Sequence, residues 1–182
     1  MNWANFVSFV RVLMIPVVVW LYFAEFEFAH LAAAILFSIA SLTDWLDGFL
    51  ARKLNQTTEF GAFIDPVADK LLVVTVLILL VAVYPVLLAA TAIIISREIL
   101  VSALREWMAM RGQRDTVKVA YIGKVKTTLQ MIAVIVLLIC TETTPEWLLQ
   151  LGLVLINVAA LLSIWSMITY FRNAWGTLFP GE

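Results

Sequence analysis

Long apolar segments alternate along this chain with short polar breaks. Six segments are apolar over the roughly 20 residues that a helix needs to cross a bilayer: 8–25, 29–51, 62–84, 86–109, 118–141 and 146–171. The breaks between them, such as 25–30 and 141–146, leave no room for a soluble domain. The pattern therefore predicts an all-α integral membrane protein in which residues 1–182 form a single membrane-embedded domain.

Composition supports a membrane protein and excludes other classes. The chain is 63% hydrophobic and 14% charged, whereas soluble domains are about 45–50% apolar and about 25% charged. A net charge of −1 provides no basic surface for nucleic acid. Cys140 is the one cysteine, so no internal disulfide forms, and we expect it to be a small packing residue. Arg11 interrupts the first apolar run, and we expect no cleavable signal peptide.

Lysine and arginine predict the orientation in the membrane. With six spans, the loops on one side hold Arg52, Lys53, Arg111 and Arg114, whereas loops 25–30, 84–86 and 141–146 on the other side hold neither residue type. Because basic loops stay in the cytoplasm, both termini and residues 44–69 are expected on the cytoplasmic side. The N-terminal ten residues mix aromatic and polar side chains, which suits an interfacial helix before the first span. An ordinary flanking segment fits that pattern equally well.

Four aspartates lie between the second and third apolar segments. Asp44 and Asp47 are three residues apart, and Asp65 and Asp69 are four apart, so on helices each pair shares one face. An antiparallel hairpin would bring the two pairs together, where four carboxylates could hold two divalent cations around a phosphoryl group. Alternatively, these acids cap helices or form ion pairs with lysine and arginine.

The residues between the two aspartate pairs favour binding of a phosphate-containing ligand. Gly48 and Ala51 lack bulk one turn from the aspartates, so a large group can approach the backbone. Arg52 offers a planar fork that matches phosphate.

Together these residues form a motif, D-x2-D-G-x2-A-R-x8-G-x3-D-x3-D. It resembles the signature of the CDP-alcohol phosphotransferases, and the matching residues are Asp44, Asp47, Gly48, Ala51, Arg52, Gly61, Asp65 and Asp69. The resemblance extends over nearly the whole chain. It implies a homodimer with six transmembrane helices and an N-terminal interfacial helix, which transfers a substituted phosphate from a CDP-linked donor to an alcohol.

The same resemblance implies roles for individual residues. The four aspartates would bind two divalent ions, Mg2+ or Mn2+, and Asp69 would also be the catalytic base. The residues expected to bind the donor, CDP-diacylglycerol, are Asn5, Ser8, Gly48, Ala51, Arg52 and Thr58. The N-terminal segment departs from the relevant branch of the family, which often has Pro-Asn where this chain has Ala4-Asn5, and Thr in place of Ser8.

The acceptor alcohol is predicted from the fourth and fifth apolar segments. They carry S-R-E-I-L-V-S-A-L-R-E-W-M-A and Y-I-G-K-V-K-T-T-L-Q-M, which resemble the phosphatidylglycerophosphate synthase branch, whose acceptor is sn-glycerol 3-phosphate. An acceptor that is itself a phosphate also needs cations of its own, which Arg97, Arg105, Lys124 and Lys126 could supply. Alternatively, the arginines pair only with Glu98 and Glu106, and the lysines flank a membrane boundary.

The predicted function is therefore transfer of the phosphatidyl group of CDP-diacylglycerol to sn-glycerol 3-phosphate, in phospholipid biosynthesis at the bacterial inner membrane. The active site would face the cytoplasm. Synthases of phosphatidylserine, phosphatidylinositol phosphate or cardiolipin in the same family are the alternatives. A cation-coupled transporter would explain the four carboxylates but not Gly48, Ala51 and Arg52.

Overall fold

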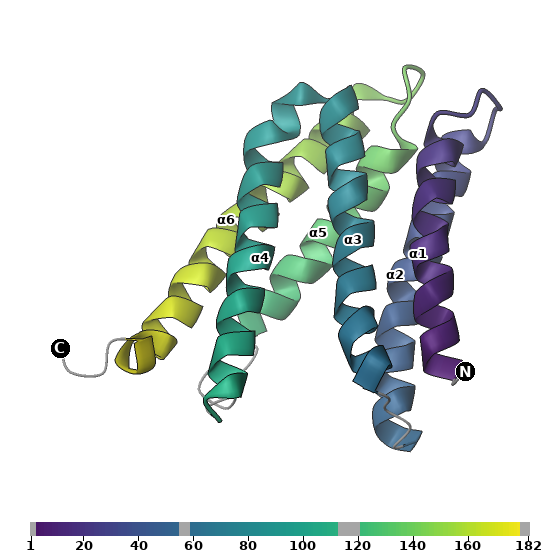
Figure 1. Ribbon diagram of the computed structural model, residues 1–182. Coiled ribbons are helices and arrows are strands. Elements are labelled where there is room, and N and C mark those ends of the chain that lie inside the picture. The colour runs from purple at the N-terminus through teal and green to yellow at the C-terminus, as the bar shows by residue number, and fades with distance from the viewer. Residues whose placement is uncertain (1–2, 55–58, 113–120, 179–182) are drawn as a thin grey trace.

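The computed structural model describes residues 3–54, 59–112 and 121–178, which form six long helices (Figure 1). The helices are α1 (Trp3–Tyr22), α2 (Ala29–Leu54), α3 (Glu59–Val83), α4 (Leu88–Met110), α5 (Tyr121–Ile139) and α6 (Glu146–Leu178). A single 3-10 turn, η1 (Pro85–Leu87), leads into α4. Each long helix coincides with one of the six apolar segments predicted from the sequence, and the described residues contain no strand, so the all-α fold is confirmed.

Two of these helices are long and apolar enough to cross a membrane, over Pro85–Met110 and Glu146–Trp175. Shorter apolar helical stretches cover Phe9–Tyr22, Ala29–Thr43 and Lys70–Val83. The count of six spans therefore stays a prediction. Helix α1 is continuous over its 20 residues, Pro16 included, so residues 3–22 show no boundary between an interfacial helix and a first span.

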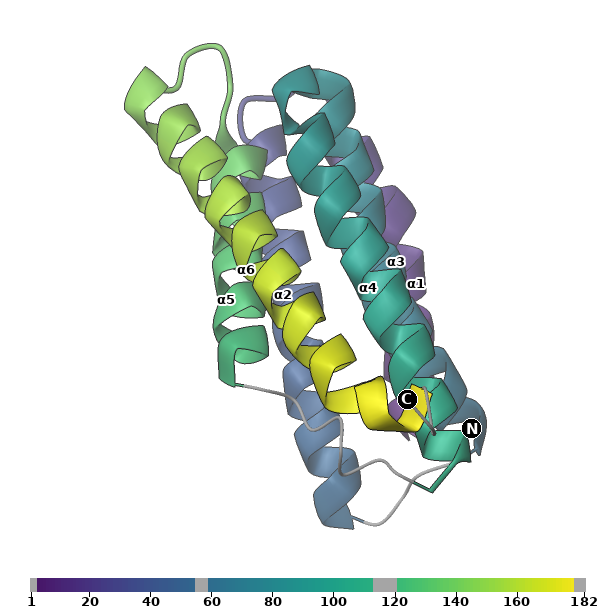
Figure 2. The ribbon, with the colours of Figure 1, turned by 90° about the vertical axis from the view of Figure 1, so that its left-hand side faces the viewer.

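The helices run up and down, and α1 begins at the end of the molecule at which α6 ends. In Figure 1 the start of α1 and the end of α6 lie at the bottom, whereas the α1–α2, α3–α4 and α5–α6 connections lie at the top. Helix α1 packs against both α2 and α3, which contact each other only slightly. Helix α6 packs against α5 and α4, and lies between them in Figure 2.

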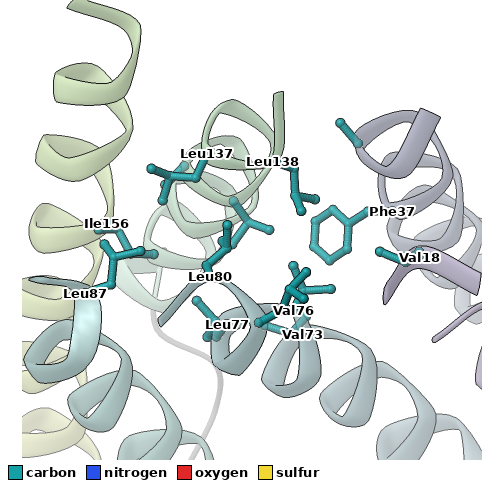
Figure 3. Packing of buried hydrophobic residues seen from close by; sticks show 14 of the residues in the cluster. Val18, Phe37, Val73, Val76, Leu77, Leu80, Leu87, Leu137, Leu138 and Ile156 are labelled. Atoms are coloured by element: carbon teal, nitrogen blue, oxygen red, sulfur yellow. The ribbon is translucent and has the colours of Figure 1, made fainter. Parts of the chain in front are cut away.

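The core is built mainly by aliphatic side chains from several helices, together with the buried rings of Tyr22 and Phe37. Phe37 of α2 is fully buried and lies among Val18, Val76 and Leu138 in Figure 3. The outward face is apolar too: Trp20, Trp147 and Trp165 are each more than 60% exposed. Large exposed apolar surface is unfavourable in water, so this distribution indicates a surface that faces lipid.

Polar side chains close the C-terminal end of α5. His30 Nδ1 lies 3.2 Å from the Leu138 carbonyl oxygen, and the Tyr84 hydroxyl donates to the Cys140 carbonyl at 3.4 Å. The last carbonyls of a helix lack partners within the helix, and these contacts supply them. Cys140 is buried with its thiol directed at the Val136 carbonyl, as expected for a packing residue.

Gly152 of α6 packs closely against side chains of α5. A Cβ atom placed on Gly152 would lie 2.7 Å from Leu137 Cδ2 and 3.3 Å from Val136 Cγ1. We expect Gly152→Leu to destabilise the protein by about 1–3 kcal/mol, because the fully buried Leu137 has little space to move. The measurement is the thermal midpoint of the purified protein in detergent. Val154→Leu, on the exposed face of the same helix, is the control, and an equal midpoint for the two variants would contradict the packing argument.

Candidate active site

A cavity of about 180 Å³ opens between α3, α4, α5 and α6. One part of its wall is charged and another part is aliphatic. The lining residues are Lys70, Val73, Val74, Leu77, Ile94, Ile95, Arg97, Glu98, Arg105, Gly123, Lys126, Thr127, Gln130, Met131 and Tyr170. Among these described lining residues are four cations and one carboxylate, so the described part of the wall carries an excess of three positive charges. Such a wall suits an anionic ligand, since attraction between charges is stronger away from bulk water.

Arg97 is held in the cavity wall by contacts on both sides of its guanidinium group. The side chain is buried, with 8% of the residue exposed. Nη2 donates to Ser166 Oγ of α6 at 2.6 Å, and Nη1 donates to Glu98 Oε1 at 3.2 Å. The Tyr170 ring, one helical turn beyond Ser166, lies 5.6 Å from the guanidinium carbon. Helix α6 therefore fixes the position of an arginine that belongs to α4.

Lys126 is the most deeply buried cation of the cavity. Only 1% of its surface is exposed, and its ammonium group donates to Glu98 Oε1, the same oxygen that Arg97 contacts. A buried ammonium is stable only when a counter-charge is close. Glu98 thus bridges a cation of α4 and a cation of α5.

Two buried polar atoms of the cavity wall have no hydrogen-bond partner within the described protein. They are Nε of Arg97, a donor, and Oε1 of Gln130, an acceptor. Buried polar groups are nearly always paired, so unpaired atoms beside a cavity are consistent with a polar ligand there. The aliphatic residues Val73, Leu77 and Ile94 complete the inner wall.

The structure brings together three of the four basic residues predicted to bind the acceptor. Arg97, Arg105 and Lys126 line the cavity, whereas Lys124 is exposed and is not among its lining residues. The structure also contains an ion pair between Arg97 and Glu98. This pairing is the alternative role that we inferred for Arg97 from the sequence. Lys126 is buried in the cavity wall.

Three functional candidates were not identified from the sequence: Lys70, Ser166 and Tyr170. Lys70 follows Asp69 directly, and in the sequence it reads as an ion-pair partner for the aspartates. Ser166 and Tyr170 are four residues apart on α6, so they share one helical face. The same helix carries other polar residues, among them Ser163 and Thr169, so this spacing gave no specific signal.

The aspartate pairs lie on helices, as predicted. Asp44 and Asp47 belong to the C-terminal half of α2, and Asp65 and Asp69 to the N-terminal half of α3. Helical backbone at both places puts each pair on one face, and α2 ends where α3 begins, at the lower end of Figure 1. The four side chains lie outside the described part of the structure. By chemistry the donor set suits hard divalent cations, which prefer carboxylate oxygen.

The predicted donor-binding residues gather at the same end. Asn5 and Ser8 lie in the first turns of α1, and Gly48, Ala51 and Arg52 in the last turns of α2. The side chains of these residues, and all of Thr58, lie outside the described part of the structure. Their contacts with a donor therefore stay a prediction.

Helix packing and the cavity define an all-helical protein with an apolar surface and a cationic pocket. Comparison with known proteins gives the family. Residues 1–168 match the family model described as CDP-alcohol phosphatidyltransferase. The chain is 47% identical over 182 residues to the CDP-diacylglycerol–glycerol-3-phosphate 3-phosphatidyltransferase of Salmonella choleraesuis, with 97% of each chain covered. It is 46% identical to the protein of the same name from Escherichia coli, covering 95% of this chain and 94% of the relative. This chain belongs to the CDP-alcohol phosphatidyltransferase family.

Ser166 tests how firmly α6 holds Arg97. Ser166→Ala leaves a buried Nη2 without its acceptor, and a hydrogen bond to a charged group contributes about 1.5–3 kcal/mol. We expect the thermal midpoint to fall and the KM for the acceptor alcohol to rise. Ser163→Ala is the matched control, because Ser163 is equally buried but donates only to the Ala159 carbonyl of its own helix. Equal effects of the two substitutions would show that Arg97 does not depend on Ser166.

Proposed function

We propose that this protein transfers the phosphatidyl group of CDP-diacylglycerol to sn-glycerol 3-phosphate and releases CMP. The observation that carries the proposal is the cavity wall with its excess of three positive charges. One of those cations, Lys70, is the chain neighbour of the predicted base Asp69. An acceptor that carries a phosphate dianion would thereby be bound next to the group that removes its proton. Relatives of 46–47% identity, aligned over nearly their full length, carry this activity in their names.

The positive charge of the cavity favours the phosphorylated acceptors of the family, glycerol 3-phosphate and inositol phosphate among them, over serine. Serine carries no phosphate, so a serine-dependent synthase has no need of four cations in its acceptor site. A phosphorylated acceptor makes charge-assisted hydrogen bonds with arginine and lysine, which are roughly twice as strong as neutral ones. Arg97, Arg105 and Lys126 are our candidates for these bonds. Lys124 has weaker support, since it lies outside the lining of the cavity.

The four aspartates are the candidate ligands for two divalent ions, Mg2+ or Mn2+. When bound, such ions neutralise the pyrophosphate of the donor and make its phosphorus more electrophilic. Gly48 and Ala51 would leave room for the donor beside α2, and Arg52 would place its fork against the pyrophosphate. Asn5, Ser8 and Thr58 complete the proposed donor site.

Asp69 is our proposed general base. It would accept the proton of the primary hydroxyl of glycerol 3-phosphate, whose oxygen attacks the phosphorus that bears diacylglycerol. The bond between this phosphorus and the oxygen of CMP breaks, and CMP leaves with the electron pair. Arg52 would stabilise the negative charge that develops on the leaving group. The products are phosphatidylglycerol phosphate and CMP.

The location of the site follows from the same proposal. The enzyme would lie in the bacterial inner membrane as a homodimer, with the aspartates and the cavity entrance on the cytoplasmic side, where glycerol 3-phosphate is dissolved. The acyl chains of the donor would stay in the bilayer.

The direct test is an acceptor screen. Purified protein is incubated with CDP-diacylglycerol and, separately, glycerol 3-phosphate, serine, inositol phosphate or phosphatidylglycerol, and CMP release is measured. We expect CMP release with glycerol 3-phosphate and none with the other three acceptors. Faster release with another acceptor would overturn the proposed specificity while leaving the family unchanged.

Removing a metal ligand is expected to abolish turnover. Asp44→Ala, Asp47→Ala and Asp65→Ala each remove a carboxylate from the set, and EDTA removes the ions themselves, so each should reduce CMP release to background. Asp69→Asn should keep donor binding but lose the chemical step, because an amide cannot accept the proton. Ordinary turnover by Asp69→Asn would require another base, and substantial activity in all three alanine variants would reject the two-metal site.

Substitution of two arginines should distinguish the acceptor site from the donor site. Arg105→Ala removes a charge-assisted hydrogen bond of about 1.5–3 kcal/mol, which corresponds to a loss of roughly 10- to 150-fold in kcat/KM for glycerol 3-phosphate. Arg52→Ala should instead raise the KM for CDP-diacylglycerol. Arg172→Ala, on the exposed side of α6, is the control with neither effect. If Arg105→Ala changes only the donor KM, the cavity serves the pyrophosphate and not the acceptor.

A further inference from the structure

One carboxylate connects two helices that otherwise barely touch. Helices α4 and α5 both pack extensively against α6, and their contact with each other is at most slight. Across the space between them, Glu98 of α4 accepts a hydrogen bond from Lys126 of α5. This ion pair therefore spans the wall of the cavity and helps to set the distance between the two helices.

The arrangement around Glu98 is asymmetric in exposure. The Lys126 side chain is 1% exposed and that of Arg97 is 9% exposed, whereas the Glu98 side chain between them is 25% exposed. The carboxylate is thus the more open member of the group, and both cations direct a nitrogen at its Oε1 atom. Without that oxygen the two cations would repel each other in a poorly solvated site.

We propose that Glu98 is a positioning residue for the acceptor, which holds the Lys126 ammonium and the Arg97 guanidinium at one wall of the cavity, ready for the acceptor's phosphate. The proposal rests on the proposed function. Glu98 does not touch the reacting atoms in this scheme. It acts by holding a nitrogen of each cation at one carboxylate oxygen, and by offsetting part of their repulsion before the phosphate arrives.

A purely stabilising ion pair would behave differently on substitution. Loss of one partner of a buried pair destabilises a protein strongly, but replacing both partners by neutral groups of similar volume is often harmless. If Glu98 serves stability alone, Glu98→Gln lowers the thermal midpoint and leaves the KM for glycerol 3-phosphate unchanged. If Glu98 positions the cations, Glu98→Gln also raises that KM, and the increase is smaller when Lys126 is already replaced by Met, because one of the cations that Glu98 holds is then absent.

The kinetic experiment measures both KM values in Glu98→Gln, Glu98→Asp, Lys126→Met and the double variant Glu98→Gln with Lys126→Met. We expect Glu98→Gln to raise the KM for glycerol 3-phosphate on the order of 10-fold, with less than a twofold change in the KM for CDP-diacylglycerol. Glu98→Asp, which keeps the charge but shortens the side chain, should lie between this variant and the parent. The acceptor KM of the double variant should exceed that of Lys126→Met by much less than this factor, because Glu98 then has one cation fewer to hold. Glu106→Gln, an exposed acid on the same helix, is the control and should leave both KM values unchanged.

A binding measurement separates this inference from the proposed function. Glycerol 3-phosphate should raise the thermal midpoint of the parent and of Glu106→Gln, because a ligand stabilises the state that binds it. The shift should be smaller in Glu98→Gln, and glycerol, which lacks the phosphate, should cause none. If the parent neither binds glycerol 3-phosphate nor releases CMP with it, the proposed function itself is rejected. If the parent does both, the role of Glu98 is rejected when Glu98→Gln keeps the acceptor KM and the full shift, or when Glu98→Gln raises the acceptor KM by the same factor in the parent and in Lys126→Met. If Glu98→Gln does not fold, Glu98→Asp and the comparison of the double variant with Lys126→Met decide by the same criteria.

Discussion

The electrostatic constraint on buried charge organises the functional half of this molecule. Lys126 and Arg97 lie inside a helix bundle whose outer surface is apolar, and a charge in such a place must be paired. Glu98 supplies the negative charge, Ser166 a neutral acceptor and Tyr170 the face of its ring. Because these groups come from α4, α5 and α6, the requirement to pair two cations also fixes how three helices are placed around the cavity.

Helix α6 packs against both α4 and α5 and holds them in place around the cavity. It packs against α5 through the contact at Gly152, and against α4 nearer its C-terminal end, where Val101 and Met108 meet Tyr170 and Ala174. Close packing on both sides leaves α4 and α5 apart from each other, and the cavity lies in the space that results. Rigid packing of this kind is what holds functional side chains in a defined geometry.

The sequence predicts the helices well because apolar segments of sufficient length have few alternatives to a helix in a membrane. The sequence predicts only part of the cavity lining. Arg97, Arg105 and Lys126 are conspicuous as charges in apolar segments, but the exposure of Lys124 depends on the rotation of α5, which the spacing of two lysines does not fix. Ser166 and Tyr170 escaped prediction because their role depends on a contact with Arg97, 69 residues away from Ser166, and such contacts leave no local pattern.

Helix α3 connects the two halves of the proposed reaction. Its N-terminal part carries Asp65 and Asp69, and from Lys70 onward, through Val73, Val74 and Leu77, it forms part of the cavity wall. A continuous helix advances about 1.5 Å per residue, so the predicted base and the lining of the cavity are separated by the shortest possible step along the backbone. Movement of α3 would therefore shift both together. Under the proposed function, the bound acceptor and the proposed base Asp69 would then keep a fixed separation, as catalysis by proximity requires.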